Sequence, residues 1–175
     1  MELAGTGSLA KGQEAITVSG GARVTLPSGW FGYLDEAPGK YKAMLRIIVP
    51  ELAAEATLIA NAVPEGMDSP RKIAEADTEV VKKYLQDYTV RGDSWTEAKV
   101  AGLPAASYTA DYKQDGKEMV EHRTYLVDEP MVYWFVFRVE KGAFKGLKPQ
   151  FDSVVGSLRR SPAKDASAAK GAEKK

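Results

Sequence analysis

Cysteine is absent from the 175 residues of this chain, and histidine occurs once, at His122. The lack of cysteine excludes disulfides, thiolate catalysis and cysteine-ligated zinc. An excess of charge of either sign is also missing, because 24 Lys and Arg residues balance 24 Asp and Glu residues. Most nucleic-acid-binding proteins carry a basic excess that neutralises phosphates, so we expect no nucleic-acid partner, although a local basic patch stays open.

Long apolar runs are missing as well. The longest, residues 131–137, is far shorter than the roughly 18 residues of a membrane-spanning helix, and residues 1–15 lack the apolar segment of a signal peptide. Leu3-Ala4-Gly5 matches the tripeptide that precedes the lipidated cysteine of bacterial lipoproteins, but Thr6 stands in place of that cysteine. Two interpretations stay open: a leader rich in small residues, or a processed or engineered remnant of an exported lipoprotein.

Composition divides the chain into three regions. Residues 1–14 are rich in Gly, Ser and Ala and predict a flexible leader. Residues 15–160 have the length and apolar content of one globular domain. Residues 161–175 contain Lys, Ala, Ser and Gly without a large apolar side chain, which predicts a disordered Lys/Ala-rich tail.

Strand patterns dominate the domain. Asp115-Gly116 predicts a tight hairpin turn, while Gly20-Gly21 and Pro38-Gly39 predict further turns. Residues 131–139 are mostly apolar on both faces that a strand would present, which predicts a central strand covered on both sides. The full set of expected strands is residues 15–18, 23–26, 31–34, 41–49, 57–63, 94–100, 105–112, 118–127 and 131–139.

Two segments predict helices. Ser69 is a favourable N-cap, followed by Pro70 at the first helical position. The apolar stripe expected to face the sheet consists of Ile73, Ala76, Val80, Tyr84 and Tyr88, widened by Val81 and Leu85. Residues 151–158, introduced by Pro149, predict a closing helix. The fold class is therefore α+β, with a central antiparallel β-sheet flanked by helices.

Several segments, in this order, carry a family resemblance. They are residues 24–30, the helix from Ser69, the turn at residues 100–105, the aromatic strand at residues 132–137 and the closing residues 151–158. Together they resemble the PsbP/Mog1/DcrB-like superfamily over roughly residues 15–160. The resemblance implies a Mog1/PsbP-like α/β/α sandwich that binds another macromolecule. It favours the bacterial envelope-protein branch, and hence a cell envelope or periplasm over cytoplasm, and it carries over no functional residue.

No catalytic, cofactor or metal site is expected. His122 lacks the Gly-x-Ser-x-Gly elbow of a hydrolase, and a single histidine would need carboxylates to complete a zinc site, so we expect a surface or boundary side chain. Asp35-Glu36 and Asp128-Glu129 fall in predicted turns, where acids are usually solvated rather than paired across a cleft.

Two short motifs resemble functional ones without their context. Arg91-Gly92-Asp93 spells an integrin-binding tripeptide, but Gly and Asp are the residues expected of an ordinary turn there. Residues 142–148 are rich in glycine but lack the Gly-Lys-Ser/Thr of a phosphate-binding loop, so a flexible link to the last helix is expected.

The leading hypothesis is a non-catalytic protein-binding or docking module. Trp30, Phe31 and Tyr33 follow a Pro-Ser-Gly turn and Trp95 follows another loop, so all four are candidate partner contacts, with ordinary packing as the alternative for each. Trp134 is expected in the core. The alternative function is a carrier or binder of a small apolar ligand, held in a cavity between sheet and helix. An enzyme ranks third.

Overall fold

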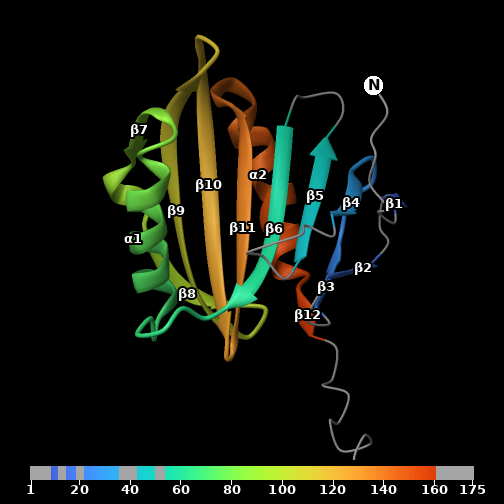
Figure 1. Cartoon of the computed structure of the whole chain (residues 1–175). Helices are drawn as coiled ribbons and strands as arrows, with labels where there is room; N and C mark the ends of the chain where they lie inside the picture. The colour runs from blue at the N-terminus through green and yellow to red at the C-terminus, as the bar shows by residue number, and fades with distance from the viewer. Residues whose placement is uncertain (1–8, 12–14, 19–21, 36–42, 50–53, 161–175) are drawn as a thin grey trace, which may run out of the picture.

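A nine-stranded antiparallel sheet forms the centre of the computed structural model, which describes residues 9–11, 15–18, 22–35, 43–49 and 54–160 (Figure 1). Its order is β1-β4-β5-β6-β11-β10-β9-β7, with β8 also paired to β9. The strands are β1 (Leu9–Lys11), β4 (Phe31–Asp35), β5 (Ala43–Val49), β6 (Ala54–Ala62), β7 (Gln86–Val90), β8 (Thr96–Val100), β9 (Leu103–Gln114), β10 (Lys117–Asp128) and β11 (Met131–Glu140). The predicted α+β class and central antiparallel sheet are confirmed.

The two helices lie on opposite faces of this sheet. α1 (Pro70–Val81) packs on β9 and β10, whereas α2 (Lys141–Gly156) packs on the other face, against β10 and β11 (Figure 1). A smaller sheet of order β12-β3-β2 joins β2 (Ala15–Val18), β3 (Ala22–Thr25) and β12 (Arg159–Arg160). β11 lies between β6 and β10, which confirms the predicted central strand.

The β9–β10 hairpin turns where the sequence predicts it. Asp115 and Gly116 both have positive φ, at 51° and 76°. This left-handed pair matches the right-handed twist of the two strands, and Asp and Gly both tolerate it. The turn fixes a register in which Glu121 lies opposite Ala110 and Tyr125 opposite Ala106.

α1 begins as predicted but buries a different face. The Ser69 hydroxyl accepts a hydrogen bond from the Lys72 backbone N–H at 3.3 Å, and the helix ends at Val81. Its buried residues are Ile73, Ala74, Thr78 and Val81. The predicted stripe is therefore right at Ile73 and Val81 but wrong at Ala76, Val80 and Tyr84, which are exposed, and Tyr88 belongs to β7. The polar positions on the inward face are satisfied there, since the Thr78 hydroxyl donates to the Ala74 carbonyl.

α2 begins ten residues before its predicted start, at Lys141 rather than residue 151, and contains Pro149. Residues 142–148 therefore form the first half of a helix, and the expectation of a flexible link is wrong. Leu147 is buried, and Phe144 packs against Phe137 with ring centroids 6.4 Å apart. Burial of these side chains outweighs the low helix propensity of the two glycines.

Two apolar clusters cover the two faces of the sheet. The larger lies under α2, where the rings of Phe137 and Phe151 stack with centroids 4.9 Å apart. The smaller lies under α1 and includes Ile73, Val81 and Tyr108. Within the described residues, no helix is long and apolar enough to cross a membrane.

The ends of the chain differ in part from the sequence expectation. β1, within the predicted leader, pairs with β4, and β12 pairs with β3. The predicted turns at Gly20-Gly21 and Pro38-Gly39, the tripeptide at residues 3–5 and the tail at residues 161–175 lie outside the described residues. The division into leader, domain and tail stays a prediction.

Candidate functional site

A buried network of charged side chains lies between α1 and the sheet. Glu121 of β10 is fully buried, and its carboxylate accepts hydrogen bonds from Arg123 Nε and from Arg138 Nε, the latter at 2.7 Å. The hydroxyl of Tyr88 donates to the same carboxylate at 2.8 Å. The strand geometry explains the convergence, because residues 121 and 123 share one face of β10 and Arg138 is the cross-strand partner of Glu121.

Asp77 connects this network to the helix. It projects from α1 and accepts hydrogen bonds from Arg123 Nη1 and from the Tyr125 hydroxyl. Two acids and two guanidinium groups are thereby brought together: Asp77, Glu121, Arg123 and Arg138. Buried charges of opposite sign satisfy one another in this way, and removal of one partner leaves an unpaired charge.

The network holds Glu121, Tyr88 and Tyr125 each in one protonation state. Burial alone would raise the pKa of Glu121, but Arg123 and Arg138 outweigh burial and lower that pKa below its usual range. Burial raises the pKa of Tyr88 and of Tyr125. The carboxylate of Glu121 is therefore ionised and these tyrosines are neutral near pH 7. Groups with fixed protonation states are suited to holding α1 against the sheet, whereas proton transfer requires groups that titrate near the working pH.

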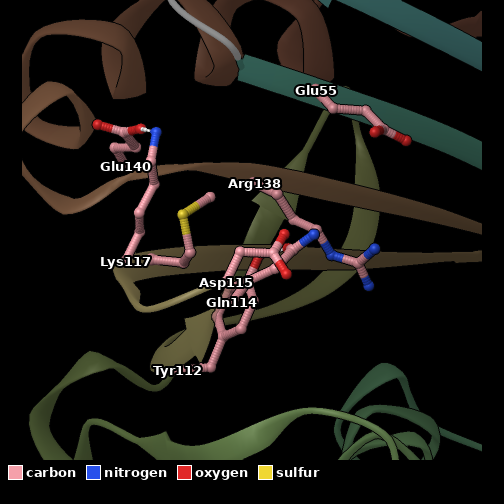
Figure 2. Close-up of a pocket in the computed structure, with 8 residues that line it drawn as sticks. Glu55, Tyr112, Gln114, Asp115, Lys117, Arg138 and Glu140 are labelled. Carbon is pink, nitrogen blue, oxygen red and sulfur yellow. Dashed lines mark hydrogen bonds and ion pairs between the residues drawn. The ribbon is translucent and has the colours of Figure 1, made fainter.

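A solvent-open groove of about 280 Å³ adjoins the network at the β9–β10 hairpin (Figure 2). Arg138 belongs to both, since it bonds Glu121 and lines the groove. Lys117 and Glu140 form an ion pair on another wall (Figure 2). The complete lining is Glu55, Tyr112, Gln114, Asp115, Lys117, Met119, Arg138 and Glu140. Among the described residues, no group of three or more acidic or histidine side chains is arranged to hold a metal ion.

On the α1 side, part of the sheet lies beyond the reach of that helix and is covered by no other helix of the described residues (Figure 1). We call it the open face; it carries Phe31, Tyr33, Arg46, Ile48, Thr57 and Ile59 from β4, β5 and β6. Tyr33 lies opposite Arg46, and Phe31 lies opposite Ile48. Ile48 is 40% exposed and is one of three exposed large apolar side chains among the described residues, with Val80 and Tyr84 on or after α1.

The structure separates the four predicted contact residues. Phe31 and Tyr33 lie together on the open face, half-buried. Trp30 lies on the opposite side of the sheet, 2% exposed, where it stacks on Phe137 and donates from Nε1 to Gln150 at 3.1 Å. Because its ring and its N–H are both satisfied internally, Trp30 is a core residue and not a surface contact.

Trp95 lies far along the sheet from the open face. The Arg71 guanidinium stands 3.6 Å above the centre of its ring, and the Tyr108 ring lies 4.6 Å away on another side. The ring is therefore half-buried by α1 and β9. Trp134, expected in the core, is half-buried beside the cluster under α1.

The remaining sequence candidates take structural roles. His122 is buried, with Nδ1 2.9 Å from the Thr109 hydroxyl, so the expectation of a surface or boundary histidine is wrong. The ring is buried because α2 covers this face of β10, where Phe144 and Phe151 pack against His122. Arg91-Gly92-Asp93 forms the predicted turn, and Arg91 holds Asp111 through two bonds of 2.7 Å.

The buried network is not among the sites expected from the sequence. A signal was present in β10, where Glu121 and Arg123 lie two residues apart on the face that also carries Met119, Tyr125 and Val127. Opposite charges on one face of an inner strand indicate a buried pair, since an unpaired charge there is costly. Asp77 gives no such signal, because a helix acid is normally exposed.

Comparisons with known proteins give the fold and no closer relative. No family model matches the chain, and no curated protein matches it. Solved structures do match. The cyanobacterial PsbP (CyanoP) of Synechocystis sp. PCC 6803 has a TM-score of 0.64 at 11% identity, covering 92% of this chain and 97% of that one.

Two further matches come from other bacteria. LpqN of Mycobacterium tuberculosis, described as involved in cell envelope biogenesis, has a TM-score of 0.62 at 15% identity and covers 91% of this chain and 88% of that one. A Bacteroides thetaiotaomicron VPI-5482 protein has a TM-score of 0.61 at 15% identity; the match covers 88% of this chain but spans only half the length of that protein. These likenesses confirm the resemblance drawn from the sequence at the level of fold: the chain adopts a PsbP/Mog1/DcrB-like fold.

Proposed function

We propose that this chain is a non-catalytic binding module that docks a protein partner through its open face. The observation that carries the proposal is the exposure of Ile48 beside the rings of Phe31 and Tyr33 and the side chain of Arg46. Aromatic and arginine side chains around an apolar centre are the usual anchors of protein interfaces. Because Ile48 lies opposite Phe31, the exposed apolar surface extends over neighbouring strands, and such a contiguous patch favours a contact surface.

The electrostatics support a non-catalytic role. In the buried network, the pKa of Glu121 lies below its usual value and those of Tyr88 and Tyr125 lie above theirs, so these groups do not exchange protons near neutral pH. Burial lowers the pKa of His122 to about 4, and its ring is enclosed by Phe144 and Phe151.

A carrier of a small apolar ligand fits the structure less well. The groove at the hairpin is lined mainly by charged and polar side chains and opens to solvent. Apolar ligands usually occupy cavities lined by hydrophobic side chains. The likeness to LpqN, described as involved in cell envelope biogenesis, supports a place for the partner in a bacterial envelope.

Paired substitutions test the docking proposal. Ile48→Lys places a charge on the open face, whereas Val80→Lys places one on the outer face of α1, where Val80 is similarly exposed at 48%. Both variants are expected to melt within a few degrees of the parent. In affinity capture from a bacterial envelope extract, we expect Ile48→Lys to lose a protein that the parent and Val80→Lys retain.

Two results would contradict the proposal. Retention of every captured protein by Ile48→Lys would remove the open face as the docking surface, and loss confined to Val80→Lys would move that surface to α1. Turnover in a broad substrate screen would overturn the non-catalytic role, provided that it co-purifies with the folded protein.

A further inference from the structure

The groove at the β9–β10 hairpin has more negative than positive groups. Glu55, Asp115 and Glu140 supply three carboxylates, whereas Lys117 and Arg138 supply two cations. Both cations are already engaged within the protein. Lys117 pairs with Glu140, and Arg138 is drawn to the buried carboxylate of Glu121, which lies behind the groove and not among its lining residues.

The remaining carboxylates are weakly engaged. Glu55 has one ion-pair partner among the described residues, Arg46 at 3.5 Å, and both side chains of this pair are about half exposed. Asp115 has no ion pair within 4 Å in the described part of the chain, and Lys117, two residues away in the sequence, is bonded to Glu140 instead. Exposed pairs of this kind contribute little free energy, so an incoming cation can replace them at low cost.

The side chains between these charged groups include an aromatic ring and a polarisable thioether. Tyr112, which is almost fully buried, and its cross-strand neighbour Met119 both line the groove. Aromatic faces attract organic cations, and a thioether is a polarisable contact for alkyl groups. A hydrated metal ion would gain nothing from such walls, whereas an alkyl chain that ends in a cation contacts wall and carboxylate together.

We propose that this groove binds an alkyl cation, a guanidinium or ammonium group on an apolar stem, with Glu55 and Asp115 as its acidic lining residues and Tyr112 and Met119 as its apolar ones. The volume of about 280 Å³ accommodates an arginine- or lysine-sized group. An anion is disfavoured, because each cation in the groove already holds a carboxylate and the remaining acids repel it. The inference concerns a small polar site and does not depend on docking at the open face.

Nuclear magnetic resonance titration of the full chain tests this site. The probes are agmatine, a capped peptide acetyl-Gly-Arg-Gly-amide and, as the anionic counterpart, glutarate. We expect both cations to shift the backbone amides of Gln114, Lys117 and Met119, with glutarate leaving them in place. Binding of agmatine alone would identify a free small molecule as the source of the cation, whereas binding of the peptide as well would admit a side chain of a partner protein.

A double variant and a matched control make the test specific. Glu55→Gln with Asp115→Asn removes both carboxylates, and Asn tolerates the positive φ at position 115. We expect about tenfold weaker binding of agmatine. Glu65→Gln with Glu97→Gln removes the same charge from exposed positions at the opposite end of the sheet and is expected to bind like the parent.

The inference is overturned if neither cation shifts groove amides, if glutarate binds as tightly as agmatine, or if the double variant and its control bind alike. Melting temperatures of both double variants, expected to match the parent, exclude misfolding as the cause of lost binding. Loss of protein capture in Ile48→Lys with unchanged agmatine binding would separate the open face from the groove.

Discussion

His122 is held as a neutral imidazole by its surroundings. Its ring lies 6.2 Å from the Phe144 ring and 5.9 Å from the Phe151 ring, and Nδ1 lies 2.9 Å from the Thr109 hydroxyl. Burial lowers its pKa from 6.5 to about 4; Lys148 lowers it further, and Asp152 opposes this change. The unfolded chain therefore binds this proton more tightly than the folded protein does.

The lowered pKa of His122 makes the folded protein less stable as the pH falls. A histidine with a depressed folded pKa contributes its full stability above about pH 6.5, and that contribution falls as the pH drops toward 4. The total loss is about 3 kcal/mol at most. We expect the free energy of unfolding, measured with denaturant, to decline between pH 6.5 and 4.5 in the parent and to stay flatter in His122→Gln.

Between pH 6.5 and 4.5, the change in unfolding free energy reflects His122 and not the buried carboxylate of Glu121. Glu121 has a pKa below its ordinary value of 4.5, so the stability that it contributes is lost only as the pH falls below that value. Equal pH slopes in parent and variant between pH 6.5 and 4.5 would show that His122 is not buried as described.

At the scale of elements, α1 shows how a helix can carry two plausible inward faces. Val80 and Val81 are adjacent, but the first is 48% exposed and the second 8%. Val81→Asp places an unpaired carboxylate against the sheet and is expected to cost several kcal/mol, on the order of 3. Val80→Asp is expected to change the unfolding free energy by less than about 0.5 kcal/mol. Similar costs in thermal or denaturant melts would contradict the observed face.

The sequence predicted strands and turns well but misplaced this helix face. Strand limits follow from local apolar runs and from turns such as Asp115-Gly116, which the sequence displays directly. The inward face of α1 depends instead on Asp77, whose partners Arg123 and Tyr125 lie 46 and 48 residues away. Periodicity assigns an acid to solvent because it does not include partners that distant.

Partners distant in the sequence also explain which candidate contact residues were predicted correctly. Phe31 and Tyr33 were predicted from a turn and lie on the open face, as a local argument allows. Trp30, which follows the same turn, is buried because Gln150, 120 residues away, accepts from its N–H. The start of α2 was missed because Phe144 and Leu147 act as anchors only once the sheet is in place.

At the scale of the molecule, the sheet has one fully covered face and one partly covered face. Under α2 the side chains form a continuous apolar cluster that includes Leu58, Phe135 and Phe151. On the α1 side, charged groups, a polar groove and the open face follow one another from β9 to β4. The larger apolar cluster therefore lies under α2, whereas the α1 side combines a smaller cluster with the exposed residues of the open face.

This asymmetry predicts that stability and binding separate by face. Phe135 is fully buried in β11, so Phe135→Ala is expected to cost about 3–5 kcal/mol of unfolding free energy. Ile48→Ala removes a half-exposed side chain and is expected to cost less than about 1 kcal/mol. Denaturant unfolding of both variants measures this contrast. In envelope-extract capture below its melting temperature, Phe135→Ala should retain the parent's partner, whereas Ile48→Ala should weaken that capture. Comparable unfolding costs for the two variants would contradict the predicted difference in stability between the faces. Loss of capture in folded Phe135→Ala alone would place the contact surface on the face under α2.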